Sequence, residues 1–289
     1  MSGIFITSLE FGLLFAPVAL GIFLTFRILN FPDLTVEGSF VAGAVVSVIA
    51  VRVGVPGLVA ILFGLIAGFF AGALTAFLHI KLGIEKILAS VLSLGMLYTI
   101  NLRLMGTPNL SLFNRGNVIW AFKSPINHLQ AILLLAIIAL AVKFFVDWFL
   151  STEIGLRLRA TGDSEAVAKS LAVNVGSMKL LGLALSNGLV GLSGALVAQY
   201  QGFADISIGQ GVVVVGLASL MLGEAMISTK RVGFVTLGAI AGSVLYQFIV
   251  NFALRLGLVG TDLKFVAASI VVVAILFGNR KSSLWKRNF

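Results

Sequence analysis

The sequence predicts an all-α membrane protein, a polytopic helix bundle of about eight to ten spans that forms one transmembrane domain over residues 1–289. Three observations predict this fold. Hydrophobic residues make up 59% of the chain and charged residues only 11%, whereas soluble domains carry about 25% charged residues. Apolar runs recur at roughly the 20-residue length that a membrane-spanning helix needs. A short sequence pattern also occurs twice, each time after a long apolar segment.

Nine apolar segments are the predicted spans. They cover residues 7–27, 37–52, 56–79, 86–104, 129–150, 180–200, 210–225, 231–252 and 262–279. The second and the seventh are short and rich in small residues, so we expect half-helices or interrupted spans there.

The orientation follows from the distribution of Lys and Arg, which collect in cytoplasmic loops of membrane proteins. Most of the 20 basic residues fall on one side when the tail with Arg280 and Lys281 is placed inside the cell. Nine crossings then put the C-terminus in the cytoplasm and the N-terminus outside. The basic residues of these loops also account for the formal net charge of +9. We therefore expect lipid around the chain and no nucleic acid as a partner.

The repeated pattern predicts two related units. Phe31–Val36 (FPDLTV) and Phe203–Ile208 (FADISI) are 172 positions apart, and the neighbouring spans repeat at the same offset. Units over about 7–104 and 180–279, with 129–150 as the connecting helix, would therefore hold four spans each in inverted topology. The alternative is that short apolar motifs recur by chance in a chain rich in Val, Ile and Gly.

Glycines at four-residue spacing predict close helix packing. Gly64, Gly68 and Gly72 would lie on one side of a single helix, and Gly238 and Gly242 would do the same on another. Small residues at this spacing let helix backbones approach each other within a membrane. The lesser alternative is that these glycines line a pore.

The longest polar connection, residues 151–179, predicts a short cytoplasmic helix. We expect Asp163 to cap it, Glu165 and Lys169 to pair one turn apart, and Val167 and Leu171 to form an apolar side. A solvated linker would need no apolar side. The helix would therefore lie either against the membrane or on a soluble partner.

This loop and two further segments resemble the ABC importer permeases of the branched-chain amino acid and ribose type. The residues that carry the resemblance are Gly155–Ala160, Asp163, Ala166, Leu171–Val175, Asn187–Ala195 and Phe31–Gly38 with Ala42 and Gly43. The likeness runs from about residue 9 to 280. Within the group it is closest to the small permeases associated with tryptophan or tyrosine uptake.

The resemblance implies a set of partners and a cell compartment. It implies a second permease subunit, expected to be an identical copy, two cytoplasmic ATPase subunits and an external solute-binding protein, all at a bacterial inner membrane. The helix at 163–172 would be the coupling helix. The residues expected to dock on the ATPase are Asp163, Glu165, Val167, Ala168 and Leu171.

No sequence motif indicates an enzyme. The phosphate-binding pattern GxxxxGK[ST] is missing, and the chain contains no Cys, so ATP and Mg would bind to the partner ATPase. His79 and His128 fall at predicted span ends, where an interfacial position explains them better than a metal or catalytic site. We therefore expect a transport subunit without a cofactor of its own.

Polar residues near the two repeated motifs are candidates for the translocation path, because ionisable groups within a membrane are costly unless they are paired or hydrated. The candidates are Asp33, Thr35 and Glu37 in the first unit and Asp205, Ser207 and Gln210 in the second. Alternatively, the carboxylates cap helices or pair with a neighbour, for which Arg27 is near in sequence. Glu10 is expected at the outer interface as a solvated charge.

These observations favour the permease subunit of an ABC importer, which passes a small solute such as an amino acid delivered from outside. The alternative is a stand-alone secondary transporter with the same repeat and no ATPase. A proton-coupled carrier of that kind would need a carboxylate in the middle of the membrane, for which Asp33 and Glu37 are the candidates.

Overall fold

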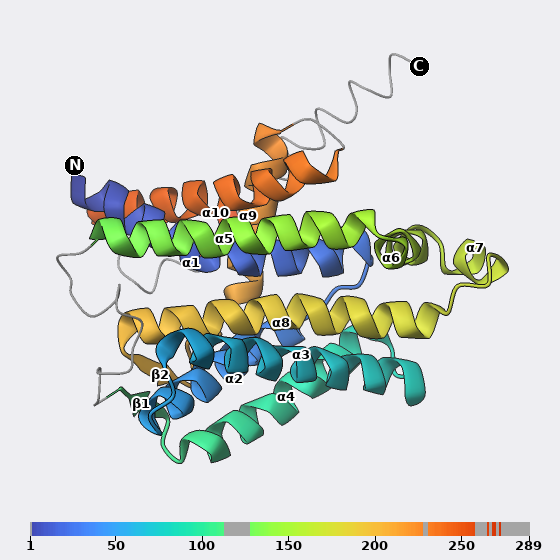
Figure 1. The fold of residues 1–289 in the computed structure, drawn as a ribbon, viewed down its shortest axis with the longest axis horizontal. Helices are drawn as coiled ribbons and strands as arrows, with labels where there is room; N and C mark the ends of the chain where they lie inside the picture. Colours follow the sequence, from blue (N-terminus) through green and yellow to red (C-terminus); the bar gives the residue numbers. More distant parts are fainter. Residues whose placement is uncertain are drawn as a thin grey trace.

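The computed structural model describes residues 2–112, 128–227 and 231–257, with isolated positions between 265 and 272. Its long helices run mostly along the longest axis of the molecule (Figure 1). The elements are α1 (Ser2–Ile22), continued by the π-helical turn η1 (Phe23–Ile28), α2 (Thr35–Arg52), α3 (Gly57–Lys81), α4 (Lys86–Met105), β1 (Asn109–Ser111), α5 (His128–Ser151), α6 (Glu153–Asp163), α7 (Glu165–Ser170), α8 (Val175–Gln201), β2 (Phe203–Asp205), α9 (Val212–Met226) and α10 (Val232–Arg255).

These helices confirm the predicted all-α polytopic bundle. In the described part of the chain, seven helices are long and apolar enough to cross a membrane, the first of them including η1. The predicted seventh span is α9, whose 15 residues reach only about 22 Å, less than the roughly 30 Å hydrocarbon layer. The predicted ninth span, 262–279, lies almost wholly outside the described residues.

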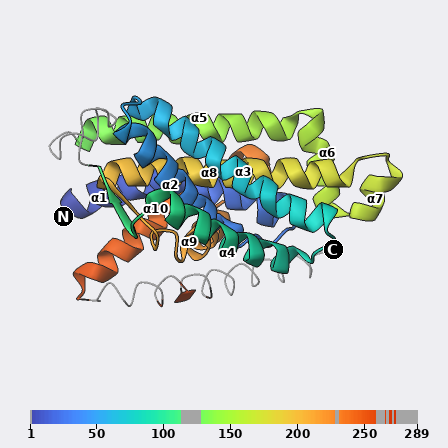
Figure 2. The same cartoon turned by 90° about the horizontal axis from the view of Figure 1, so that it is seen from below.

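Helix α8 occupies the centre of the bundle, with α1 on one side and α2 and α3 on the other (Figures 1 and 2). It is buried along most of its length, as are α1 and α2, whereas α4 and α5 expose most of their surface. The exposed side chains on these outer helices are largely apolar, as at Val91, Met96, Phe144 and Trp148. Such a surface suits lipid contact, because lipid tails do not penalise exposed apolar groups as water does.

The first glycine series lies at the contact of α3 with α8, as its predicted packing role requires. A methyl group added at Gly68 would lie 2.1 Å from the backbone oxygen of Asn187, and one at Gly72 would lie 2.2 Å from that of Leu183. At Gly64 it would meet the side chain of Ala195 at 2.6 Å. The two helices therefore approach backbone to backbone, which a larger residue on α3 would prevent.

The second glycine pair brings α10 against α9 in the same way. A methyl group at Gly242 would lie 2.0 Å from the backbone oxygen of Ser219. Helix α10 also packs along α1, as α3 packs along α8. Each proposed unit thus places its third helix against the first helix of the other unit. This reciprocal packing of the two units fits the inverted repeat. The repeat stays a prediction, because its last span lies outside the described residues.

The two copies of the repeated motif share one local geometry and then differ. The backbone N–H of Thr35 donates to Asp33 Oδ1 at 2.9 Å, and that of Ser207 donates to Asp205 Oδ1 at 2.8 Å. Thr35 begins α2, but Ser207 lies in a turn before α9, which starts only at Val212. The second motif therefore does not lead directly into a helix, because Gly211, with a φ of 85°, redirects the chain before α9.

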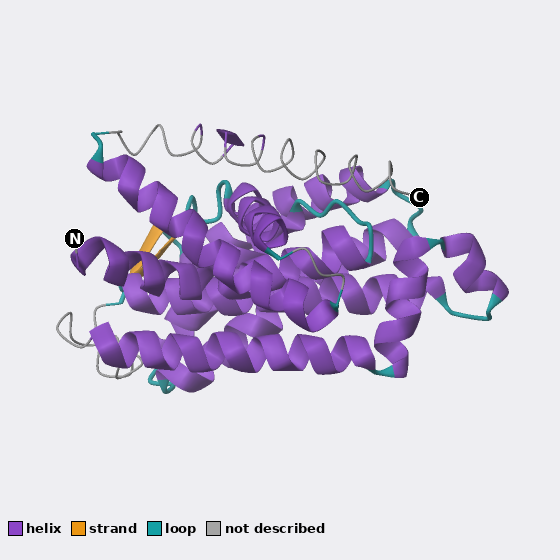
Figure 3. Ribbon diagram, turned by 90° about the horizontal axis from the view of Figure 1, so that it is seen from above, coloured by secondary structure: helices purple, strands orange, loops and turns teal. Residues whose placement is uncertain are grey.

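The two ends of the bundle carry different structures. Helices α6 and α7 project at one end, and the antiparallel pair of β1 and β2 lies at the other, near the N-terminus (Figures 1 and 3). The strand pair aligns Asn109 with Asp205 and was not predicted from the sequence. Trp120 and Phe122, which the sequence places in the same loop as Asn109, lie outside the described residues.

Candidate functional site

A cavity of about 410 Å³ lies among α2, α4 and the segment that leads into α9. Its apolar wall includes Val41 from α2 and Val91 and Leu94 from α4. Its polar lining consists of Glu37, Tyr98, Asn101 and Gln210. Of the six residues predicted for the translocation path, Glu37 and Gln210 thus lie together in one cavity, although 173 positions separate them in the sequence.

Glu37 joins two walls of this cavity. It lies in the first turn of α2, and its Oε1 accepts a hydrogen bond from the backbone N–H of Gly211 at 2.8 Å. The chain can approach α2 this closely because residue 209 is glycine: an added methyl group there would lie 2.3 Å from the backbone oxygen of Glu37. In the described part of the chain, no donor reaches the second oxygen of the Glu37 carboxylate.

Asn101 contributes a buried amide from α4. Its Nδ2 donates to the backbone oxygen of Gly38 at 3.1 Å, which fixes the orientation of the amide, since that oxygen only accepts. The side chain is 1% exposed, and its Oδ1 has no hydrogen-bond partner among the described residues. A buried acceptor without a partner costs about 1–3 kcal/mol, so this oxygen is a candidate for contact with a ligand.

Asp33 and Thr35 do not line this cavity. Both are fully buried in a polar cluster that joins α2, α3 and α8. Asp33 Oδ2 accepts from Asn187 Nδ2 at 2.7 Å, and the hydroxyl groups of Thr35 and Thr75 lie 2.6 Å apart. The hydroxyl of Ser39 donates to Asn187 Oδ1 at 2.6 Å. Asp33 is thus held by neighbouring groups at the start of α2 and does not face the cavity.

Asp205 and Ser207 lie at the end of the bundle that carries the strands. The hydroxyl and the backbone N–H of Ser207 donate to Asp205 Oδ1, and Asn109 Nδ2 donates to Oδ2 at 3.2 Å. The hydroxyl of Ser207 is the main reason that the pKa of Asp205 lies below its ordinary value; partial burial opposes this effect, and the N–H of Ser207 and the amide of Asn109 add to it. These contacts hold a turn and join the two strands.

Two further predictions about charged residues were wrong. Glu10 is buried, not solvated: Tyr200 donates its hydroxyl to Glu10 Oε2 at 2.8 Å, and His128 Nδ1 lies 2.9 Å from Oε1. Arg27 does not pair with the carboxylates of the first motif but binds Glu224 of α9 through two nitrogens. All three partners, Tyr200, His128 and Glu224, are distant in sequence from the residues they bind, so these pairs depend on the folded bundle.

The cap of the loop helix α7 lies one residue later than predicted. Ser164 is the capping residue and accepts from the N–H of Val167 at 3.4 Å, whereas Asp163 ends α6. The predicted apolar side exists: Val167 is 56% exposed and Leu171 is 67% exposed, while Ala168 is fully buried. An exposed apolar pair on a polar loop helix is suited to docking on a protein partner.

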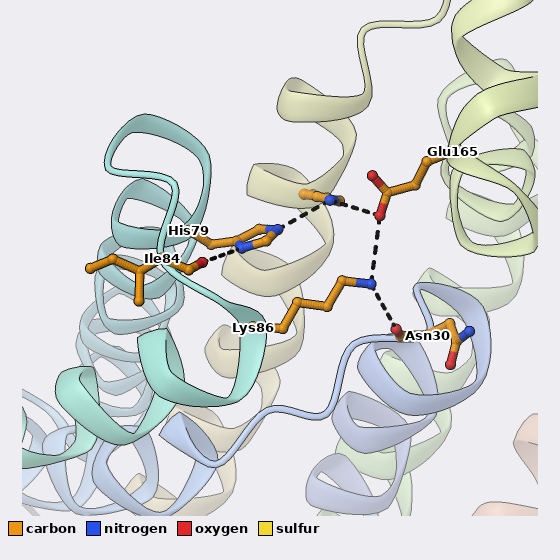
Figure 4. A network of polar contacts seen from close by, with 6 residues as sticks. Asn30, His79, Ile84, Lys86 and Glu165 are labelled. Carbon is orange, nitrogen blue, oxygen red and sulfur yellow. Dashed lines mark hydrogen bonds and ion pairs between the residues drawn. The ribbon is translucent and has the colours of Figure 1, made fainter.

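Glu165 anchors α7 to the membrane helices (Figure 4). It does not pair with Lys169 as predicted; its Oε1 lies 2.8 Å from Lys179 Nζ of α8 and 3.5 Å from Lys86 Nζ of α4. Burial raises the pKa of Glu165, but the hydrogen bond and charge of Lys179, with the charge of Lys86, outweigh burial and lower it overall. Sequence spacing could not find these partners, because they come from other helices.

The hydrogen bonds around Glu165 continue to the segment before α2 and to the loop between α3 and α4. Lys86 Nζ donates to the backbone oxygen of Asn30, which precedes α2, at 3.4 Å. His79 Nδ1 lies 2.7 Å from the backbone oxygen of Ile84, between α3 and α4, and Nε2 lies 3.1 Å from Lys179 Nζ. Because a carbonyl only accepts, Nδ1 carries the proton and Nε2 accepts from Lys179. His79 therefore lies in the last turn of α3, at the span end where it was expected, and makes a specific bond to Lys179 there.

Tyr98 and Lys86 were not predicted as candidates from the sequence. Tyr98 and Asn101 lie one turn apart on α4, and Lys86 is the first residue of that helix. A polar residue within an apolar span is the signal that marks Asn101 and that could also have found Tyr98. No local signal marks Lys86, which looks like an ordinary basic residue at a membrane surface.

Comparison with known proteins agrees with this geometry. A tyrosine transport system permease protein of Clostridioides difficile (strain R20291) is 40% identical over 290 residues, which cover 100% of this chain and 95% of that protein. The autoinducer 2 import system permease protein LsrC of Shigella flexneri is 28% identical, over 79% of this chain and 64% of its own.

A solved ABC transporter of metal-chelate type, in an inward-facing conformation, shares the fold: the TM-score is 0.53 at 19% identity, over 96% of this chain and 85% of the other. Residues 4–278 match the family described as branched-chain amino acid transport system, permease component. The chain therefore belongs to this family of ABC importer permeases.

Proposed function

We propose that this chain forms the membrane path for an aromatic amino acid, with tyrosine as the first candidate. The path would lie between two identical copies of the chain in a bacterial inner membrane, with the C-terminus in the cytoplasm. An external binding protein would deliver the solute, and two cytoplasmic ATPase subunits would hold the ATP and Mg. The 40% identity to a tyrosine permease over the whole chain supports the choice of solute.

One observation carries the coupling part of this proposal: α7 presents exposed Val167 and Leu171 while Glu165 ties it to α4 and α8. A partner that moves α7 would therefore pull on Lys86, which begins α4. The same helix supplies Val91, Leu94, Gly95, Tyr98 and Asn101 to the cavity. ATP-driven movement of the ATPases would reach the cavity wall through this one helix.

The proposed path differs from the one predicted from the sequence. It keeps Glu37 and Gln210, which line the cavity, and assigns Asp33, Thr35, Asp205 and Ser207 to holding the chain at the two repeated motifs. A stand-alone secondary transporter is not favoured, because the family match covers residues 4–278 and is to ABC importer permeases.

Replacing Val167 and Leu171 together by Asp is expected to abolish association with the ATPase, since two charges would enter an apolar contact. The measurement is purification of the chain from native membranes, with the co-purifying proteins identified by mass spectrometry. The control is Val53→Asp, an exposed apolar residue (75%) at the end of α2. Recovery of a stoichiometric P-loop ATPase with the double variant would refute the docking role of α7.

A further inference from the structure

The cavity beside Glu37 offers hydrogen-bond acceptors and apolar walls but no basic side chain. Glu37 has one carboxylate oxygen engaged by Gly211, and no donor among the described residues reaches the other. Asn101 presents a buried amide oxygen that is equally without a partner in that part of the chain. These two acceptors suit a ligand that supplies donors, because a buried acceptor such as Asn101 Oδ1 is costly to leave unpaired.

We propose that this cavity binds the ammonium group of the transported solute, with Glu37 as the counter-charge and Asn101 as a second acceptor. The proposal rests on the transport function proposed above and names the part of the solute that the permease itself recognises. Protonated amines donate three hydrogen bonds and accept none, which matches the unpaired oxygens. Val41, Val91 and Leu94 would then contact the apolar body of the solute.

The size and the remaining polar groups fit such a ligand. A volume of about 410 Å³ is within the range of roughly 300–1,000 Å³ that is usual for small-molecule sites. The hydroxyl of Tyr98 and the amide of Gln210 also line the cavity and can donate to the carboxylate of an amino acid. Because neither is charged, we expect the carboxylate to contribute less to binding than the ammonium group.

The test uses the purified complex of permease and ATPase in nanodiscs, without the external binding protein, so that only the permease selects the ligand. Binding of radiolabelled tyrosine is measured in competition with tyramine, which lacks the carboxylate, and with 3-(4-hydroxyphenyl)propionate, which lacks the amine. We expect tyramine to compete and the propionate to fail. The proposal would be overturned if tyramine and the propionate competed equally well. It would also be overturned if neither tyrosine nor tyramine bound to the wild-type complex.

Three variants locate the site. Glu37→Gln keeps an oxygen for the N–H of Gly211 but loses the charge, and we expect tyrosine to bind about tenfold or more weakly. Gly95→Leu should block binding by filling the cavity, because Gly95 lines it and a Cβ atom added there meets no atom within 4 Å. Glu153→Gln removes an equally charged but 86% exposed carboxylate on α6 and should bind as the wild type does.

The outcomes separate this proposal from the proposed function. If the complex contains its ATPase and transports tyrosine, but Glu37→Gln binds tyrosine as tightly as the wild type, the ammonium site is wrong and the importer stands. If no ATPase accompanies the chain, the importer proposal fails, whereas an unchanged preference for tyramine with a weakened Glu37→Gln variant would still support the ammonium site.

Discussion

Replacing Gly68 by Ala is expected to destabilise the folded bundle by about 3 kcal/mol or more, which is the upper range for forcing extra atoms into a packed contact. The added methyl group would lie 2.1 Å from the backbone oxygen of Asn187 and 3.0 Å from the Cα of Gly191. Both neighbours are backbone atoms of α8, so no side chain can rotate away. Helix α3 would have to separate from the central helix.

The measurement is the thermal stability of the purified protein in detergent, with Gly3→Ala as the matched control. Gly3 is also helical, but a methyl group there meets no atom within 4 Å, so its replacement should leave the melting temperature unchanged. A Gly68→Ala protein as stable as this control would show that α3 and α8 do not meet as described.

Replacing Glu165 by Ala is expected to lower uptake about fivefold or more while the ATPase remains bound, which is the range of a typical coupling free energy between two sites. The variant keeps Val167 and Leu171 on α7 but releases this helix from Lys179 and Lys86. The variant would therefore still bind the ATPase through α7 but would no longer pass its movement to α4 and α8. The change in folding stability should be small, below about 1 kcal/mol, because Glu165 is partly exposed.

Uptake, ATP hydrolysis and co-purification of the ATPase are measured on the same preparation. Glu153→Ala is the control, since it also removes a carboxylate from the segment between α5 and α8 but breaks only the exposed pair with Arg157. The account predicts continued hydrolysis with reduced uptake for Glu165→Ala alone. Loss of bound ATPase from that variant would instead make Glu165 a docking residue.

The fold class could be predicted from the sequence alone. Helices that contact lipid need few charged residues and apolar runs long enough to cross the membrane, and both features can be read from the sequence. It could also be predicted from the sequence that α3 packs closely against another helix. Three glycines at four-residue spacing have few other uses in a membrane helix. The partner helix was not predictable, since the atoms of α8 nearest to Gly68 and Gly72 are the backbone oxygens of Asn187 and Leu183, which every residue carries.

The candidate site was predictable only in part. Glu37 and Gln210 were found because polar residues are rare within apolar segments and both follow the repeated motif. The same reasoning could not show that Asp33 would be buried and bound by Asn187 and Thr35. A carboxylate is satisfied either by such protein donors or by a position that lines a cavity, and the sequence does not distinguish the two. The local pattern that suggested a pair of Glu165 with Lys169 could not compete with two lysines from α4 and α8.

The most direct measurement of the central claim is uptake of labelled tyrosine into proteoliposomes that contain the purified complex and its external binding protein. The account predicts accumulation only when ATP and Mg are supplied on the side of α7, with none driven by a proton gradient alone. Accumulation by the isolated chain under a proton gradient, without any ATPase, would contradict the account and identify a secondary transporter.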